Sequence, residues 1–210
     1  DIGLAVLSTG VFQLLAIPVY ALLANRFDLR WILMFGLSLF ALSMWDFSPI
    51  THDWGAKELL LPQAIRGFAQ QMAVPPVVTL TLGALAPDRL KLASGLFNLM
   101  RNLGGAVGLA VINQILTDRG ALHYAQLSEH VRWGNPEADD LMASMSSNFT
   151  TRGLDGPAAA LARMSAMVHQ QASLLSFMDV FYILTVLFAS LAVFAVMMRK
   201  PGAPAGGGGH

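Results

Sequence analysis

The sequence predicts an all-α transmembrane protein, and three observations lead to that fold class. Hydrophobic residues make up 55% of the 210 residues and charged residues only 12%, and the mean hydropathy is +0.55. The apolar residues gather in segments of about 20 residues, the length at which a helix crosses a bilayer. Arginine and lysine recur in alternate connections between these segments. The composition is too apolar for an ordinary soluble domain of this size, and the spacing of the apolar and basic segments is typical of a membrane protein.

Five segments are long and apolar enough to span a membrane, and four of them lie within residues 1–116. The five cover about 2–24, 31–50, 59–85, 93–116 and 174–198. The connections 25–30 and 87–92 and the start of the tail 199–210 are basic, whereas 46–58 is more acidic than basic. The positive-inside rule therefore places the basic connections and the C-terminus in the cytoplasm and the long connection 117–173 outside it.

The long connection 117–173 contains two helix start signals. Asn135 precedes Pro136, and Asp155-Gly156 precedes Pro157. A capping residue followed by proline in the first turn is typical of a helix N-terminus. The connection is therefore expected to form an extracytoplasmic loop with short helices. The tail beyond Pro201 is rich in glycine, alanine and proline, a composition that predicts a flexible segment.

The segment 93–116 carries a polar stripe that a plain lipid anchor would not need. At helical spacing one face holds Asn98, Arg101, Gly105 and Gly108. A charge inside a membrane helix is costly unless it is paired or faces a wet cavity, so Arg101 is a functional-site hypothesis. Asn98 and Arg101 either line or gate a transport path, or pair with backbone groups to pack the bundle. The Gly104/Gly108 pair favours close helix packing over homodimerisation.

A second polar stripe lies in the outer half of the segment 59–85. Gln63, Arg66 and Gln70 share one helix face. One interpretation is that Arg66 snorkels to the membrane surface. The other is that all three face a cavity, which the two accompanying amides favour. Pro75-Pro76 follows midway along the segment and predicts a bend.

Several other kinds of chemistry find little support in the sequence. The chain has no cysteine and a formal net charge of zero, which excludes thiolate sites and leaves no electrostatic footprint for nucleic acid. No acid, base and nucleophile cluster at helical spacing indicates an enzyme. The five histidines are scattered without metal-site spacing and are interpreted as loop residues. They are His52, His123, His130, His169 and His210.

Five stretches of the sequence form a recognisable series. They are the turn after Asn25, Ala86-Pro87-Asp88-Arg89-Leu90, the ASGLFNLMR start at Ala93, the His-x-x-Gln-Leu-x-Glu pattern from His123, and Gln170-Gln171-Ala172. In this order they resemble the C-terminal end of EmrB/QacA-type multidrug efflux permeases, in the fourteen-helix drug:proton antiporter branch of the major facilitator superfamily. The last two features are closest to the EmrB side. The resemblance implies that the chain is a C-terminal fragment holding the last five of fourteen helices.

The resemblance also assigns roles to particular residues. The turn with Asn25, Arg26, Asp28 and Arg30 is similar to the cytoplasmic signature G-x-x-x-D-R-x-x-x-R, although Asn25 replaces its aspartate. From physics alone, a solvated basic loop is the favoured interpretation of this turn. Asp179 matches an acidic residue that EmrB-like sequences carry shortly before a phenylalanine, here Phe181.

The family implies export of amphipathic or lipophilic compounds by alternating access, driven by the proton motive force without a bound cofactor or metal. The expected partners are the bilayer, N-terminal helices upstream of Asp1, a periplasmic adaptor and an outer-membrane channel. The expected location is the bacterial inner membrane. No span carries a carboxylate at its middle. The main proton carrier is therefore expected upstream, with Asp179 the local candidate. A metabolite or siderophore exporter and a non-transporting scaffold subunit remain as alternatives.

Overall fold

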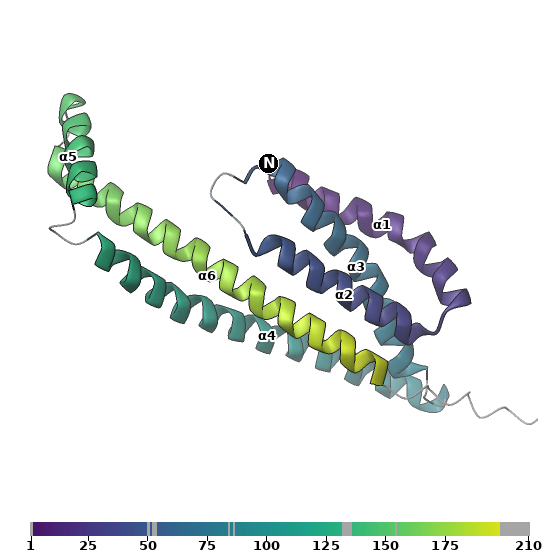
Figure 1. Cartoon of the computed structure of the whole chain (residues 1–210). Coiled ribbons are helices and arrows are strands. Elements are labelled where there is room, and N and C mark those ends of the chain that lie inside the picture. Colours follow the sequence, from purple (N-terminus) through teal and green to yellow (C-terminus); the bar gives the residue numbers. More distant parts are fainter. Residues whose placement is uncertain are drawn as a thin grey trace, which may run out of the picture. The chain divides into compact units, whose positions relative to one another are not determined.

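A computed structural model describes residues 2–49, 51, 54–83, 85, 87–131, 136–153 and 155–197. These residues form six helices and no strand, which confirms the all-α class. The helices are α1 (Ile2–Arg26), α2 (Leu29–Phe47), α3 (Ala56–Leu82), α4 (Pro87–His130), α5 (Pro136–Thr151) and α6 (Gly156–Met197), as Figure 1 shows. The expected flexible tail 199–210, with His52, Asn135 and His210, lies outside the described residues.

The chain divides into two compact units. The first comprises Asp1–Leu109 with Phe181–His210, and the second comprises Ala110–Val180. The long helices α4 and α6 therefore each contribute one part to each unit. The first unit contains α1, α2 and α3, whereas the second contains α5 with the adjoining ends of α4 and α6.

Helix α3 is the centre of the first unit because both α1 and α2 pack against it (Figure 1). Ala16, Ile32 and Met72 form one buried cluster, to which the three helices contribute one residue each. Gly36 and Gly67 are the points of closest approach. A Cβ at position 36 would lie 2.7 Å from the Ala73 backbone nitrogen, and one at position 67 would collide with the Thr9 carbonyl oxygen. Glycine is therefore what lets these helices pack at this distance.

Two hydroxyl groups add hydrogen bonds between the helices of the first unit. Ser43 is fully buried and donates from its hydroxyl to the Pro62 carbonyl oxygen at 2.9 Å. Thr9 donates to the Gln63 side-chain oxygen at 2.8 Å. Such bonds satisfy polar groups that lipid would leave without partners.

Aromatic rings join α2 to the last part of α6. Phe40 stacks on Phe188 with ring centroids 5.0 Å apart, and Phe47 stacks on Phe181 at 5.2 Å. The same stretch of α6 adds Ala195 to a buried cluster with Leu33 and Ala73. Helices α2, α3 and the end of α6 are thus held by apolar contacts over much of their length.

Helices α4 and α6 extend well beyond the spans expected from hydropathy. The segment 117–173, expected to be a loop with short helices, contains the last part of α4, all of α5 and the first part of α6. The starts of α5 at Pro136 and of α6 at Gly156 agree with the two capping signals. The helix ends differ from expectation because hydropathy marks where a helix leaves the lipid and not where the helix itself ends. Residues 117–130 contain no proline and only one glycine, Gly120, so nothing in that stretch interrupts α4.

Among the described residues, four helices are apolar and long enough to cross a membrane: α1, α2, α4 and α6. Helix α3, the third expected span, has 27 residues, enough to cross, but Pro62, Pro75 and Pro76 and several polar residues lower its hydropathy. The helix continues through all three prolines. Its crossing stays a prediction, supported by the two apolar helices that pack against it.

Candidate functional site

The second unit contains a cluster of charged and titratable side chains between α4 and α6. His123 Nε2 lies 2.8 Å from Asp179 Oδ2, so that the imidazole N–H donates to the carboxylate. Arg119 approaches the same oxygen from one turn earlier on α4, with its Nε at 3.7 Å. The side chains of His123 and Asp179 are 17% and 35% exposed, whereas that of Arg119 is 50% exposed. Asp179 therefore faces two cationic or protonatable groups in a partly enclosed setting.

The helix backbones near the cluster come close because the residues between them are small. Gly120 on α4 faces the hydroxyl of Ser176, with a Cβ at position 120 lying 3.5 Å from Ser176 Oγ. Ser176 is 2% exposed and donates to the Ala172 carbonyl of its own helix. One turn further on, the ring of Tyr124 stacks on that of His169 with centroids 4.2 Å apart. These contacts fix the register in which His123 meets Asp179.

The arrangement has a definite chemical capacity. Histidine is the side chain that most readily exchanges a proton near neutral pH. A neighbouring carboxylate can accept the hydrogen bond of an imidazole N–H. The contact therefore joins α4 to α6 through two side chains that can each carry a proton. Among the described residues no group of histidine and acidic side chains has the arrangement of a metal site.

The structure places the three polar residues of α3 on a half-buried face. Gln63 is engaged by the Thr9 hydroxyl, which gives it a packing contact with α1. Within the described part of the chain, Arg66 forms no ion pair. Gln63 is therefore hydrogen-bonded to α1, while the roles of Arg66 and Gln70 remain predictions.

The stripe on α4 has a different environment. Asn98 and Arg101 are exposed, and no side chain from Arg89 to Glu129 is fully buried. A Cβ added at Gly104, Gly105 or Gly108 would meet no described atom within 4 Å. The structure thus does not bring this stripe together with Gln63, Arg66 and Gln70. Packing through these glycines stays a prediction.

The cytoplasmic turn of the expected signature connects α1 to α2. Asn25 and Arg26 end α1 and are exposed, and Asp28 precedes α2 in an extended conformation. Arg30 lies in the first turn of α2, where its Nε and Nη2 atoms are buried without a hydrogen-bond partner among the described residues. A solvated loop does not account for buried guanidinium nitrogens, so Arg30 is the member of the turn that is least like a plain basic loop residue.

Sequence reasoning missed His123 and Arg119 as site residues, and the interpretation of His123 as a loop histidine is wrong. The miss follows from ending the predicted helix at residue 116. Arg119 and His123 are four residues apart, which places them on one face of α4 once that helix is extended. The signal was therefore present in the spacing, but only for a helix that continues past the apolar segment.

Comparisons with known proteins converge on one group. The family model described as Major Facilitator Superfamily matches residues 1–127. Multidrug export protein EmrB of Escherichia coli is 30% identical over 99% of this chain. Colistin resistance protein EmrB of Acinetobacter baumannii is 28% identical over 95%, and fatty acid resistance protein FarB of Neisseria gonorrhoeae is 25% identical over 99%.

The chain spans only about 40% of the length of these curated relatives: 40% of the Escherichia coli protein, 39% of the Acinetobacter protein and 40% of the Neisseria protein. No solved structure matches it.

Proposed function

The chain belongs to the major facilitator superfamily, and from that premise we propose that it is part of a proton-coupled efflux transporter of the bacterial inner membrane, with its C-terminus in the cytoplasm. The relatives are named for multidrug export and for resistance to colistin and to fatty acids. Colistin and fatty acids each join an apolar chain to a charged group. Amphipathic or lipophilic compounds are accordingly the proposed substrates, and transport rather than enzymatic conversion is the proposed activity.

The contact between His123 and Asp179 carries the proton-coupling part of the proposal. The two side chains lie 2.8 Å apart on different helices. Loading a proton on Asp179 would remove the negative charge that attracts both His123 and Arg119, and so would loosen the link between α4 and α6. Alternating access needs helices whose packing changes with the bound ion. The main proton carrier is still proposed to lie upstream of Asp1, and this pair acts with it.

The test uses the full-length protein in liposomes, with ethidium as the transported probe. Asp179→Asn should retain downhill ethidium movement but lower accumulation driven by a pH gradient about tenfold, the effect of losing about 1.4 kcal/mol. Asp118→Asn is the matched control, because Asp118 is an exposed carboxylate on α4 whose partner is Gln114. Gradient-driven accumulation by Asp179→Asn at the control's level would refute the role of this pair.

The polar residues of α3 and α4 are proposed to border the transport path. Gln63, Arg66 and Gln70 lie on one half-buried face of α3, and Asn98 and Arg101 lie on an exposed face of α4. An exposed arginine on an apolar helix requires a partner or water within a membrane, so the upstream helices are the proposed neighbours of the α4 face. Gly104, Gly105 and Gly108 would let those helices approach closely.

The segment with α5 is proposed to contact a periplasmic adaptor that leads to an outer-membrane channel. Its support is the length of the helical segment between the apolar parts of α4 and α6. Deleting residues 135–155 from the full-length protein should abolish crosslinking to the adaptor while leaving membrane insertion intact. Unchanged crosslinking after the deletion would remove the adaptor from the proposal.

Two other functions would be distinguished by the same assays. An exporter of one metabolite or siderophore would show the Asp179→Asn effect with that compound but would not move ethidium. A scaffold subunit would show no transport of any probe and no effect of charge removal. The proximity of Asp179 to both Arg119 and His123 favours a transporter over a scaffold, because a scaffold needs no titratable pair between its helices.

A further inference from the structure

The guanidinium group of Arg30 is a charge without a counterion in the described part of the chain. Its Nε and Nη2 atoms are buried and have no hydrogen-bond partner there, and both ion pairs that the described residues form involve Asp179 instead. Removing a charge from water is unfavourable unless an opposite charge or hydrogen-bond acceptors replace that water. Arg30, in the first turn of α2, therefore indicates the position of an anion.

An apolar cavity of about 360 Å³ lies in the same unit and begins one helical turn from Arg30 along α2. Leu33 and Leu37 line it and follow Arg30 by three and seven residues, so that all three share one helix face. At the rise of a helix they lie about 4.5 and 10 Å further along the axis. Helices α3 and α6 supply the remaining described lining, which consists of Val77, Leu80, Thr81, Leu191, Phe194 and Ala195.

The wall of this cavity suits an acyl chain. Leu33 and Ala195 are 4% and 3% exposed, whereas Phe194 is 65% exposed, so the cavity has a buried floor and an open side. The hydroxyl of Thr81 donates to the Val77 carbonyl of its own helix, so this polar group is satisfied without a ligand. No acidic or basic residue belongs to the described lining. The cavity is therefore an apolar groove that ends near one cation.

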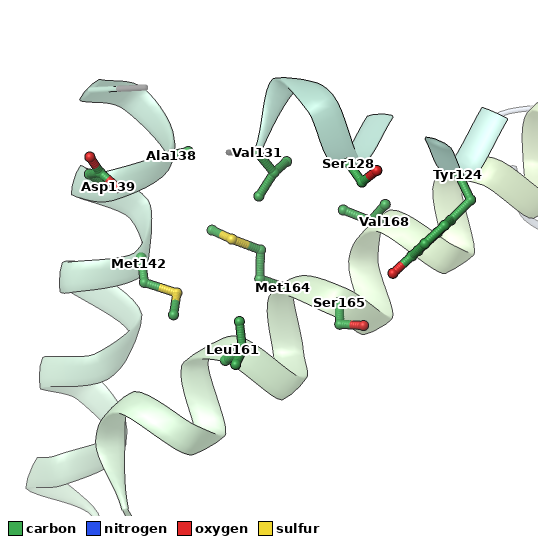
Figure 2. Close-up of a pocket in the computed structure, with 10 residues that line it drawn as sticks. All are labelled: Tyr124, Ser128, Val131, Ala138, Asp139, Met142, Leu161, Met164, Ser165 and Val168. Atoms are coloured by element: carbon green, nitrogen blue, oxygen red, sulfur yellow. The ribbon is translucent and has the colours of Figure 1, made fainter. Parts of the chain in front are cut away.

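The cavity of the second unit offers no such cation. It lies among the end of α4, helix α5 and the start of α6, with Met142, Leu161 and Met164 in its wall (Figure 2). Neither arginine nor lysine belongs to its described lining. Because it is another largely apolar cavity along α6, it serves as a comparison for the effect of added bulk.

We propose that the site of the first unit binds one anionic phospholipid, with its phosphate at Arg30 and one acyl chain in the apolar cavity. A phospholipid fits both features, since its phosphate lies at the membrane surface and its acyl chains lie below. Guanidinium and phosphate form paired, charge-assisted hydrogen bonds. Nη1 of Arg30 is not enclosed as Nε and Nη2 are. A phosphate therefore reaches Nη1 first, and rotation of the side chain then presents a second donor.

The position of Arg30 also agrees with the depth of a lipid headgroup. The orientation proposed above puts the start of α2 at the cytoplasmic surface, where anionic lipids attract basic residues. The inference rests on the proposed function for the choice of leaflet alone. The bound lipid supplies the counterion that the described residues lack, and its acyl chain fills the space between α2, α3 and α6.

Titration with dioleoylphosphatidylglycerol tests the charged end of the site. Binding to the full-length protein in detergent is followed by native mass spectrometry. Arg30→Gln should weaken binding of the first lipid about tenfold, because charged hydrogen bonds to the phosphate are lost. Arg89→Gln is the matched control, since Arg89 is an exposed arginine near the start of α4 and does not share the helix face of the cavity. Equal affinities of the two variants would overturn the proposal.

A pair of identical substitutions tests the apolar end. Leu191→Trp adds bulk to the cavity of the first unit and should weaken binding of phosphatidylglycerol at least several-fold. Leu161→Trp adds the same bulk to the cavity in Figure 2 and should leave that binding unchanged. Both leucines lie on α6 and both are exposed, at 42% and 58%. Unchanged binding by Leu191→Trp would remove the acyl chain from this cavity and so contradict the proposal.

Two other ligands test which part of the lipid is recognised. Dioleoylphosphatidylcholine has the same acyl chains but a headgroup without net charge, and oleate has a chain and a carboxylate but no phosphate. Phosphatidylglycerol should bind several-fold more tightly than either. Equal binding of phosphatidylcholine would show that charge does not select the lipid, and equal binding of oleate would show that a phospholipid is not required. Either result would overturn the proposal.

Thermal unfolding separates a lipid from a protein counterion. In detergent without lipid, Arg30→Gln should melt no lower than the unsubstituted protein, because the substitution removes a buried charge that lacks a partner. Phosphatidylglycerol should raise the melting temperature of the unsubstituted protein and not that of Arg30→Gln. A lower melting temperature of lipid-free Arg30→Gln would mean that a carboxylate from the upstream helices already pairs with Arg30, against the proposal. These measurements require no transport, so they are independent of the proton-coupling test.

Discussion

His123 and Asp179 are 56 positions apart in the sequence, yet His123 Nε2 and Asp179 Oδ2 lie 2.8 Å apart. The contact ties α4 to α6 next to Gly120 and Ser176, where the two helices are close. Arg119 adds a second approach to the same carboxylate oxygen at 3.7 Å. The Asp179 carboxylate thus contacts two residues on consecutive turns of α4. The effects on stability of substituting any two of these three residues should therefore be coupled.

A double-mutant cycle measures that coupling. His123→Ala and Asp179→Asn should each lower the stability of the full-length protein in detergent. The double variant should lose less stability than the two single variants together. The difference should be about 0.5 to 3 kcal/mol, because both substitutions remove the same interaction. Thermal unfolding followed by tryptophan fluorescence gives the four values. Strict additivity would mean that the contact contributes nothing to stability.

The close approach at Gly36 predicts a packing defect when a methyl group is added. A Cβ there would lie 2.7 Å from the Ala73 nitrogen and from the Met72 carbonyl carbon, and backbone atoms cannot move aside as a flexible side chain can. Gly36→Ala should destabilise the protein by about 1 to 3 kcal/mol. Gly10→Ala is the control, since a Cβ at position 10 would meet no other described residue within 4 Å. Equal melting temperatures of the two variants would contradict this account of α2 and α3.

The buried hydrogen bond from Ser43 to the Pro62 carbonyl predicts a smaller loss. Ser43→Ala removes a donor that is fully buried between α2 and α3, and it should cost about 1 kcal/mol. Ser190→Ala removes an exposed bond to the Val186 carbonyl within α6 and should cost less. Chemical unfolding of both variants in the same detergent compares them. A larger loss of stability in Ser190→Ala than in Ser43→Ala would mean that the hydrogen bond between α2 and α3 does not stabilise the protein more than one within a helix.

These features also show how far the sequence predicts the molecule. Hydropathy placed the apolar parts of α1, α2, α4 and α6, and the capping residues before Pro136 and Pro157 marked two helix starts. Hydropathy could not predict that α4 continues to His130, because it responds to the change from lipid to water and not to the end of a helix.

The candidate site was predicted only in part for the same reason. Asp179 is indicated by its match to an acidic residue of EmrB-like sequences, but its partners His123 and Arg119 belong to the extended part of α4. The contact of Gly36 with Ala73 likewise depends on how two helices dock, and a single glycine in an apolar run does not specify its neighbour. Contacts between distant segments are set by tertiary packing, which no local pattern contains.

The exposed face of α4 leads to the last prediction, which concerns Arg101. Its guanidinium has no ion-pair partner in the described part of the chain, and its helix face is open. If upstream helices cover this face and it borders the transport path, Arg101→Ala and Arg101→Gln should abolish ethidium export by the full-length protein at normal abundance. Arg101→Lys should retain part of it, since lysine keeps the charge but not the planar donor set.

Abundance in the membrane separates a transport role from a packing role for Arg101. The control is Lys91→Ala, an exposed charge near the start of α4 that should affect neither export nor abundance. A cation that borders the path is needed for transport but not for insertion, so export per molecule should fall while the amount of protein stays constant. If export per molecule survives all three Arg101 substitutions while abundance falls, Arg101 serves to pack the helices, because only a structural role predicts loss of protein without loss of turnover.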